Sequence, residues 1–154
     1  MRGSAVDRFW AKVEKTGTCW NWTATGSNGY GHFSLNRRTV LAHRFSFELV
    51  NPPIPAGTEI DHTCHNRSCV NPEHLRLATR KQNCENLSGA YKNSKSGIRG
   101  VYWIESGKRW DAFVGHGGKF MRVGSFSTSE EAERAVKARR LELFTHNNLD
   151  RTAS

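Results

Sequence analysis

The sequence predicts an α+β fold divided between two small modules, and three observations support this. Residues 59–87 have the pattern of two short strands followed by a helix, a ββα unit. Three alternating segments within residues 99–126 precede one helical pattern, which predicts an antiparallel sheet packed on a helix. A stretch rich in Ser, Gly, Lys and Asn separates the two patterns. We therefore expect a first module at 1–88, a linker at 89–97, a second module at 98–146 and a flexible tail at 147–154.

The first module begins with several short elements. Residues 5–14 have the spacing of an amphipathic helix, and residues 19–23 alternate like a strand. A turn is expected over residues 26–31. A hairpin follows, with strands over 30–35 and 38–40.

A helix and the ββα unit complete the first module. Residues 41–49 fit a helix with one apolar face, formed by Leu41, Phe45 and Leu49. The prolines within residues 52–55 end this helix. We then expect a strand ending at Asp61-His62, a cysteine-bearing loop, a strand over residues 75–78 and a helix capped by Thr79.

The second module is expected to contain three strands and one long helix. The strands cover residues 99–105, 109–116 and 119–126, and a Gly117-Gly118 turn joins the last two. The helix covers residues 127–144, with Ser127 or Ser129 as its cap. Its expected core residues are Ala132, Ala135, Val136, Leu141 and Phe144.

Composition and charge narrow the range of functions. The chain has 154 residues, of which 36% are hydrophobic, so it can form two small modules without large cores. Lys and Arg outnumber Asp and Glu by 23 to 14, and the net charge of +9 indicates a polyanionic partner, either nucleic acid or an acidic membrane surface. Because the sequence shows neither a run of 18 apolar residues nor a signal-peptide pattern, we expect a cytoplasmic protein that does not span a membrane.

Three potential metal ligands lie close together in the cysteine-bearing loop. Cys64 and Cys69 are followed by His74, and such ligands suit zinc, which usually takes four in a closed structural site. Cys19 is the preferred fourth ligand, because its bond would connect a distant strand to the loop, and His65 is the alternative. The competing interpretation is that the cysteines are small core residues and that His74 is a hydrogen-bonded core histidine.

Asp61, His62 and Asn83 form a second set of polar residues in the ββα unit. A neutral imidazole accepts a proton from water near pH 7, which makes His62 a candidate general base. A carboxylate and an amide oxygen hold a hard divalent ion such as magnesium, so Asp61 and Asn83 are candidate ligands for a catalytic ion. The competing interpretation is that all three are polar surface residues.

The combined pattern resembles the HNH, or ββα-metal, nucleases, and is most similar to phage HNH proteins and His-Cys box homing endonucleases. The pattern consists of Asp61-His62, Cys64, Cys69, residues 71–75 and Asn83. Its members lie 2, 7, 12 and 21 residues after His62, in agreement with those families. Plain HNH enzymes often carry Asn where this chain has His74, so His74 is assigned to zinc. The resemblance covers about residues 19–87.

The resemblance implies a role for each of these residues. His62 is implied as the general base and Asn83 as a ligand of the catalytic ion. The implied ligands of one structural zinc are Cys19, Cys64, Cys69 and His74. Phage HNH nickases use the Asp before the base as a second ligand of the catalytic ion, which implies Asp61, whereas His-Cys box enzymes lack it. Arg44, on the preceding helix, is a candidate contact for the scissile phosphate.

The second module carries a resemblance of its own, on residues 99–103, 108–113, 123–128 and 130–132. These segments resemble the plant APETALA2/ethylene-response-factor domain, which also occurs appended to HNH homing endonucleases. The resemblance covers about residues 97–144. It implies a three-stranded antiparallel sheet packed on one helix, with the sheet entering the major groove of DNA. The central strands fit loosely, so base preferences do not carry over.

Strand alternation indicates which side chains of the second module face DNA. Residues 91–125 contain seven Lys or Arg residues and only two acidic residues, Glu105 and Asp111. The residues expected on the helix side are Trp110, Ala112, Val114, Met121 and Val123. The expected DNA-binding residues are Arg99, Tyr102, Phe113, Lys119, Phe120 and Arg122. A basic, aromatic sheet face without a second layer is typical of a binding surface, and a solvated charged face is the alternative.

The sequence thus predicts a metal-dependent DNA endonuclease of homing or phage HNH type, with one structural zinc and a catalytic magnesium or other divalent ion. Its expected partner is double-stranded DNA, with no small-molecule substrate, and its expected location is the host cytoplasm of a phage-encoded protein. The alternative is a non-catalytic, zinc-containing DNA-binding regulator. A structural phage protein or an RNA-binding protein fits the charge alone. Monomer and homodimer both stay open, because one chain supplies one active site.

Overall fold

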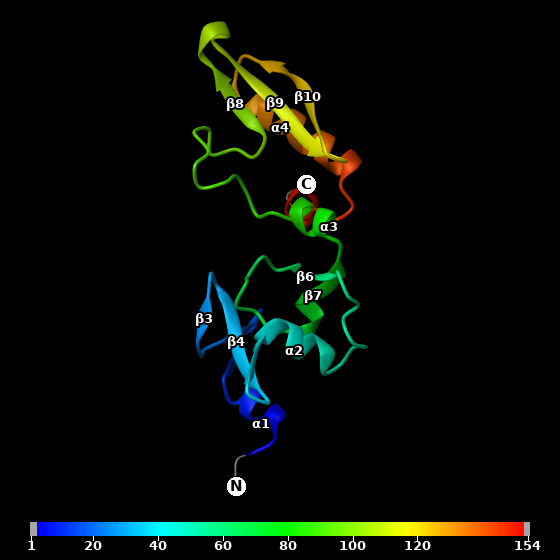
Figure 1. Cartoon of the computed structure of the whole chain (residues 1–154). Helices are drawn as coiled ribbons and strands as arrows, with labels where there is room; N and C mark the ends of the chain where they lie inside the picture. The colour runs from blue at the N-terminus through cyan, green and yellow to red at the C-terminus, as the bar shows by residue number, and fades with distance from the viewer. Residues whose placement is uncertain (1–2, 153–154) are drawn as a thin grey trace. The chain divides into compact units, whose positions relative to one another are not determined.

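The computed structural model describes residues 3–152 and divides into two compact units, Met1–Asn83 and Cys84–Ser154 (Figure 1). The division falls earlier than the expected end of the first module at residue 88. Residues 89–97, the expected linker, contain neither helix nor strand. Among the described residues, none of the helices is long and apolar enough to cross a membrane.

Short helices and antiparallel sheets make up the first unit. Its elements are α1 (Ala5–Trp10), β1 (Val13–Lys15), β2 (Trp20–Trp22), β3 (Gly26–Ser27), β4 (Tyr30–Leu35), β5 (Arg38–Leu41), α2 (Ala42–Glu48), β6 (Glu59–His62), the 3-10 helix η1 (Pro72–His74), β7 (Leu75–Ala78) and α3 (Arg80–Glu85). Strand β1 pairs with β2, β4 lies between β3 and β5, and β6 pairs with β7. The two strands and the helix expected over residues 59–87 are therefore present as β6, β7 and α3.

Two apolar clusters hold these elements together. The larger contains Phe9, Trp22, Phe33, Ala42 and Val70, and the smaller contains Phe47, Ile60 and Leu75. The packing around Trp22 is so close that a Cβ at Gly31 would lie 2.4 Å from its ring, which explains the glycine there. The smaller cluster joins α2 to the β6–β7 hairpin, so α2 is fixed against the strand that carries the candidate catalytic residues.

Helix α1 is shorter than expected. It ends at Trp10 rather than at residue 14, and residues 13–15 form β1 instead. Val13 pairs with Trp22 across β1 and β2 and packs against the larger cluster. This long-range strand pairing overrides the helical pattern of the sequence.

The buried side of α2 also differs from the expected face of Leu41, Phe45 and Leu49. The buried residues are Ala42, His43, Ser46 and Phe47. Burial of the polar Ser46 is possible because its hydroxyl donates a hydrogen bond to the carbonyl of Val70, at 2.5 Å. The orientation of α2 is therefore decided by what it packs against rather than by its most apolar stripe.

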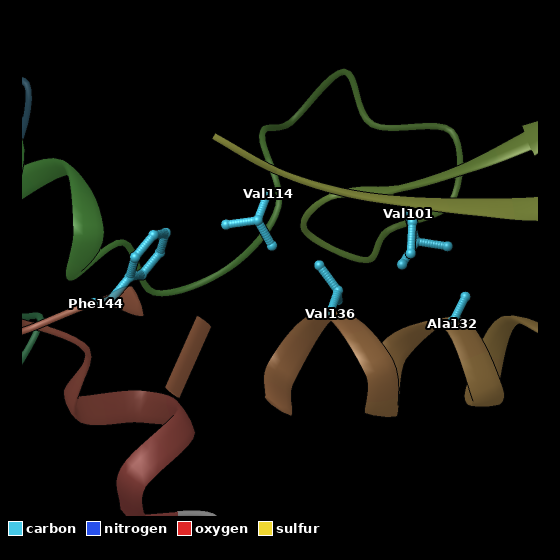
Figure 2. Close-up of a cluster of buried hydrophobic side chains, with 6 residues drawn as sticks. Val101, Val114, Ala132, Val136 and Phe144 are labelled. Atoms are coloured by element: carbon cyan, nitrogen blue, oxygen red, sulfur yellow. The ribbon is translucent and has the colours of Figure 1, made fainter. Parts of the chain in front are cut away.

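The second unit is a three-stranded antiparallel sheet with one long helix on one face. Its elements are β8 (Val101–Ile104), the 3-10 helix η2 (Glu105–Gly107), β9 (Arg109–His116), β10 (Lys119–Phe126), α4 (Ser129–Leu143) and α5 (Asn148–Thr152). Strand β9 lies between β8 and β10. Figure 2 shows Val101 and Val114 on the sheet side of the core and Ala132 and Val136 opposite them on α4. Strands β9 and β10 have the predicted bounds, whereas β8 is shorter than the predicted strand at 99–105 and α4 is shorter than the predicted helix at 127–144.

The caps and core residues of α4 differ in detail from expectation. Neither Ser127 nor Ser129 is the cap; Thr128 is, in a capping box with Glu131. The buried helix residues are Ala132, Val136 and Arg140. The expected core residues Ala135 and Leu141 are half-buried.

The segment expected as a flexible tail contains a short helix. Residues 148–152 form α5, and residues 153–154 lie outside the described part of the chain. Asp150 of α5 is buried, and its carboxylate accepts hydrogen bonds from Arg140 of α4 at 2.6 and 3.0 Å. Because breaking a buried ion pair leaves an uncompensated charge, this contact holds α5 in place.

Candidate metal centre and active site

Four metal-binding side chains come together in the first unit. The ligand atoms of Cys19, Cys64, Cys69 and His74 all lie within 4.8 Å of one another. Nδ1 of His74 is 3.5 Å from Sγ of Cys69 and 3.8 Å from Sγ of Cys19. Tetrahedral zinc, with bonds of about 2.1–2.3 Å, holds its ligand atoms about 3.5–4 Å apart. The donor set and its spacing therefore fit zinc, and the cluster contains Cys19 rather than the alternative His65.

Backbone hydrogen bonds explain how Cys19 reaches the distant loop. Strand β2, which follows Cys19, is bonded to the loop between β6 and β7. The amide of Trp22 donates to the carbonyl of Ser68 at 2.9 Å, and the amide of Val70 donates to the carbonyl of Trp20 at 2.7 Å. On the other side of the cluster, η1 places His74 directly before β7. Cys19 therefore meets ligands that are distant in sequence, because the strand that follows it is hydrogen-bonded to the backbone of the loop between β6 and β7.

Burial makes two thiols of the cluster, Cys64 and Cys69, poor acids. Burial is the largest cause that raises the pKa of Cys64 to about 12, and the neighbouring Cys69 and Cys19 also raise it. Burial likewise raises the pKa of Cys69. A bound cation reverses this preference because it stabilises the thiolate form. The cluster is therefore chemically suited to a metal ion and unsuited to three free thiolates.

His62, at the end of β6, is held by the same loop. Its Nε2 lies 3.1 Å from the carbonyl oxygen of Cys69. Because a carbonyl oxygen only accepts hydrogen bonds, Nε2 carries the hydrogen and Nδ1 carries the lone pair. Burial is the main cause that lowers the pKa of His62, although the Cys69 carbonyl and Asp61 oppose it. His62 is thus a neutral imidazole near pH 7, with a defined basic nitrogen.

Two rings that the sequence analysis did not single out pack around His62. The ring of His43 on α2 lies 4.8 Å from that of His62, and the ring of Tyr30 lies 5.9 Å from it. Burial, followed by the charges of His62 and Arg44, lowers the pKa of His43 to about 3. His43 is therefore neutral as well. The only sequence signal for it was a histidine on a helix, and the buried side of that helix was not the expected one.

Asp61 and Asn83 are placed by strand β6 and helix α3. Strand alternation puts Asp61 and Glu59 on the face of β6 opposite to His62. Arg76, across the hairpin, donates from Nε to Oδ2 of Asp61 at 2.9 Å, and its Nη2 lies 2.7 Å from the same oxygen in an ion pair. Asn83 donates from Nδ2 to Oε2 of Glu59 at 2.6 Å. The carboxylates of Asp61 and Glu59 thus share one face of β6, and the amide nitrogen of Asn83 contacts Glu59. Carboxylate and amide groups of this kind supply the oxygen ligands that a hard divalent ion prefers.

Glu59 and Arg76 were not among the expected site residues. The structure brings Asn83 into direct contact with Glu59, and it pairs Asp61 with Arg76. Glu59 precedes Asp61 by two residues in an alternating strand, so the sequence did contain a signal that both side chains share a face. The Asp61–Arg76 pair follows from the register of the hairpin, which no local pattern specifies.

Arg44 lies on α2 and is half-buried. Its Nη1 donates to the carbonyl of Thr58 at 3.3 Å, just before the start of β6. This contact directs the side chain toward the loop that enters β6. The assignment of Arg44 to a phosphate contact stays a prediction.

In the second unit, three of the expected DNA-binding residues form one aromatic cluster. The ring of Tyr102 lies 5.9 Å from that of Phe113 and 6.2 Å from that of Phe120. The rings of Phe113 and Phe120 are stacked, with centroids 4.9 Å apart and planes 9° from parallel. They come from β8, β9 and β10 respectively, so one cluster crosses the whole sheet.

Of the three cationic residues expected to bind DNA, one lies on the same face of the sheet as the aromatic cluster and two do not. Arg122 lies on the aromatic face, where it bonds to the carboxylate of Asp111. Arg99 instead donates to the backbone carbonyls of Cys84, Glu85 and Leu87, at 3.0, 3.0 and 3.4 Å respectively. Lys119 alternates with Phe120 and so points to the other side of the sheet. Arg99 and Lys119 are therefore not part of the aromatic face.

The match to a known protein family lies almost entirely within the first unit. Residues 40–84 match the HNH endonuclease family. The matched range contains Arg44, Asp61, His62, Asn83 and three of the four residues of the Cys–His cluster. Cys19 and the sheet of the second unit lie outside it, so the resemblance of that sheet to the APETALA2 domain stays a prediction.

Similar proteins occur in phages and in a giant virus. The chain is 39% identical over 70 residues to protein 7.7 of Escherichia phage T7, covering 45% of this chain and 54% of that protein. It is 36% identical over 98 residues to protein 2.8 of the same phage, covering 62% of this chain and 65% of that protein. It is 30% identical over 120 residues to an HNH endonuclease of Acanthamoeba polyphaga mimivirus, covering 77% of this chain and 60% of that protein.

These matches support a nuclease of HNH type. The chain spans between 54% and 65% of the length of these relatives. No solved structure matches the chain. The nuclease assignment therefore rests on the family match to the first unit and on the residues that this match contains.

Proposed function

We propose that the chain is a metal-dependent DNA endonuclease that hydrolyses phosphodiester bonds and leaves 5′-phosphate and 3′-hydroxyl ends. The observation that carries the proposal is the state of His62. Its Nε2 bonds to the carbonyl of Cys69, which leaves the lone pair on Nδ1, and burial keeps the ring neutral near pH 7. A neutral imidazole with a fixed basic nitrogen is what general-base activation of water requires.

In this mechanism His62 accepts a proton from the attacking water at Nδ1. Asp61 and Asn83 are the residues that would hold a divalent ion, with Glu59 fixing the amide of Asn83. When bound, such an ion stabilises the charge that develops on the phosphate and on the leaving 3′ oxygen. Arg44 is assigned to the scissile phosphate. The zinc cluster acts structurally, because its residue Cys69 also orients His62.

Duplex DNA is the proposed substrate. The net charge of +9 favours a polyanion, and phosphate contacts from Lys and Arg supply affinity without sequence preference. The second unit is assigned to DNA binding rather than to catalysis. The relatives in phage T7 fit a phage-encoded enzyme of homing or HNH type that acts in the host cytoplasm.

A plasmid assay tests the proposal. The purified chain is incubated with supercoiled plasmid, with and without added magnesium, and nicked and linear products are measured. His62→Ala is expected to lower the cleavage rate by about 10²–10⁴-fold, which is the usual contribution of a general base. His32→Ala, which removes a histidine from β4 in the same unit, is the matched control and should cut like the wild type.

The binding of DNA is measured in parallel on the same variants. His62→Ala should retain its zinc content and its affinity for duplex DNA, because His62 is proposed as a base and not as an anchor. Cleavage by His62→Ala at the wild-type rate would overturn the mechanism. A wild-type chain that binds duplex DNA but never cuts it, at any magnesium concentration, would favour the alternative of a DNA-binding regulator.

A further inference from the structure

The free face of the sheet in the second unit presents the three rings of the aromatic cluster to solvent. Phe120 is 63% exposed and Tyr102 is 48% exposed, which is unusual for large apolar side chains in a small unit. Helix α4 and the core it covers lie on the opposite face. Gly115 is the cross-strand partner of Phe120, so the ring of Phe120 projects from the sheet without a neighbouring side chain opposite it.

The rings are mutually ordered rather than scattered. Phe113 and Phe120 stack in parallel, and Tyr102 meets both of them edge-on. A stacked pair of this kind has a planar exposed surface on its outer ring. Planar π surfaces on adjacent strands are suited to other flat rings, which gain about 1–3 kcal/mol for each base stacked on an aromatic side chain.

Positive charge surrounds the cluster on the same sheet. Arg109 and Arg122 both bond to the single carboxylate of Asp111, at 3.1 and 3.4 Å. Because two guanidinium groups share one buried carboxylate, the local charge stays positive, and both arginines are about half exposed. Nearby, Lys108 is paired with Glu105, so the excess positive charge comes from Arg109 and Arg122.

We propose that this aromatic face binds a single-stranded segment of DNA by stacking its unpaired bases on Phe120, Phe113 and Tyr102. The guanidinium groups of Arg109 and Arg122 contact the phosphates of that segment. The choice of DNA over other nucleic acids rests on the proposed nuclease function. Strand β9 is roughly 23 Å long at about 3.3 Å per residue, which is room for several nucleotides laid along the sheet.

The side chains of the face favour an unpaired strand over the major groove of a duplex. Most base-edge contacts in a groove are hydrogen bonds, and a phenylalanine ring, which has no donor or acceptor for them, offers the groove only an apolar contact with the thymine methyl group. In a duplex the flat faces of the bases are covered by their stacked neighbours, so the rings would find no partner there. An unpaired strand exposes those flat faces.

A second copy of the chain is a poorer occupant of this face. Two identical faces brought together would place Arg109 and Arg122 of each copy close to those of the other. The whole chain also carries a charge of +9, so self-association is opposed by charge repulsion. A polyanion with exposed flat rings satisfies both the charge and the shape of the face.

The test measures binding by the full-length chain in magnesium-free buffer, so that the probe is not consumed by cutting. The probes are a labelled oligothymidylate of about 12 nucleotides, within the site sizes of small β-rich modules, and a duplex of the same length. Phe120→Ala is expected to weaken single-strand binding about 10-fold and duplex binding far less. Phe120→Trp should retain single-strand binding, because the indole also stacks.

Two further variants separate stacking from other effects. Phe120→Leu keeps an apolar side chain without a π surface and should lose as much single-strand affinity as Phe120→Ala. Tyr91→Ala removes an aromatic ring that is 74% exposed and lies outside the strands, and should bind both probes like the wild type. Circular dichroism of each variant confirms that the fold is kept, since Phe120 lies outside the buried core.

The proposal is overturned if Phe120→Ala binds the single strand as the wild type does, or if Phe120→Leu does. It is also overturned if both probes lose affinity equally, because that result indicates a general loss of charge or fold. Plasmid cleavage is scored separately. Cleavage without any effect of Phe120 on single-strand binding removes this inference alone. Single-strand binding that depends on Phe120 in a chain that never cuts removes the proposed nuclease function alone.

Discussion

The backbone carbonyl of Cys69 accepts a hydrogen bond from Nε2 of His62 at 3.1 Å, while the thiol of the same Cys69 belongs to the candidate metal cluster of Cys19, Cys64, Cys69 and His74. One residue therefore connects the structural metal site to the candidate general base. Any change that displaces the loop at Cys69 alters the tautomer and the orientation of His62, because the carbonyl is what fixes the hydrogen on Nε2. The metal cluster and the activity are expected to respond together.

The zinc cluster should hold one zinc ion in each chain, and losing a ligand should release it. Cys64→Ser or Cys69→Ser is expected to abolish zinc retention and to unfold the first unit, because zinc binding and folding are coupled in units this small. Metal analysis by mass spectrometry and near-ultraviolet circular dichroism measure the two effects. Cys84→Ser is the matched control, since Cys84 is exposed and outside the cluster, and it should retain zinc. A folded Cys69→Ser protein that cuts DNA without zinc would contradict this prediction.

Glu59 should position Asn83 for the catalytic ion. Its Oε2 accepts the hydrogen bond of the Asn83 amide nitrogen at 2.6 Å, which directs the amide oxygen elsewhere. Glu59→Leu removes the acceptor and is expected to raise the magnesium concentration needed for half-maximal cleavage by about 10–100-fold, as for other residues that support metal ligands. Glu59→Gln keeps an oxygen acceptor and should be affected less. Glu73→Leu, an exposed acid on η1, is the control. An unchanged magnesium requirement in Glu59→Leu would refute the role.

His43 should make the first unit less stable in mild acid. Its pKa is lowered to about 3 by burial first, and then by His62 and Arg44, whereas an unfolded histidine titrates near 6.5. Between these values the unfolded chain binds the extra proton, so the free energy of unfolding falls as pH decreases through this window. The loss is up to about 1.4 kcal/mol per pH unit for this histidine. His62, whose pKa is also lowered, adds to it in the same direction.

Urea unfolding at neutral and mildly acidic pH, in the presence of zinc, measures this effect. His43→Phe removes the titrating group and keeps an aromatic ring, so its stability should depend less on pH than that of the wild type. Tyr30→Phe preserves both histidines and should keep the wild-type dependence. Equal pH dependence in His43→Phe and the wild type would show that His43 does not carry the effect.

The second unit should fold alone only when residues before the expected linker are included. Glu85 is buried, and its Oε2 accepts hydrogen bonds from the backbone amides of Thr145 and His146 at 3.0 and 3.3 Å. A fragment of residues 84–154 retains these contacts and the carbonyl partners of Arg99. A fragment of residues 94–154 lacks them and should be less stable by several kcal/mol, at about 1.5–3 kcal/mol for each hydrogen bond to a charged group.

Thermal unfolding of the two fragments, followed by circular dichroism, checks this boundary. The longer fragment should unfold cooperatively, and the shorter one at a lower temperature or without a transition. Equal melting temperatures would mean that residues 84–93 contribute nothing to the second unit. The sequence analysis instead places the boundary within the linker at residues 89–97, because that segment is rich in Ser, Gly, Lys and Asn.

Local sequence patterns are sufficient to predict β9, β10, α4 and the spacing of the three loop ligands. Alternation over residues 109–126 and the helical repeat predicted over residues 127–144 are local patterns, and the structure contains both, with the helix at Ser129–Leu143. Cys64, Cys69 and His74 lie within one short loop, so their spacing alone brings them together. These features depend on residues that are close to one another in the sequence, so a single sequence is enough to predict them.

Other features depend on contacts between residues that are distant in sequence, and these features are visible only in the folded chain. The preference for Cys19 over His65 became a geometric result only when β2 paired with the cysteine-bearing loop. The buried side of α2, and with it the contact between His43 and His62, follows from packing rather than from apolar periodicity. In each case the stabilising free energy comes from contacts with residues that are distant in sequence, so no local sequence pattern predicts the feature.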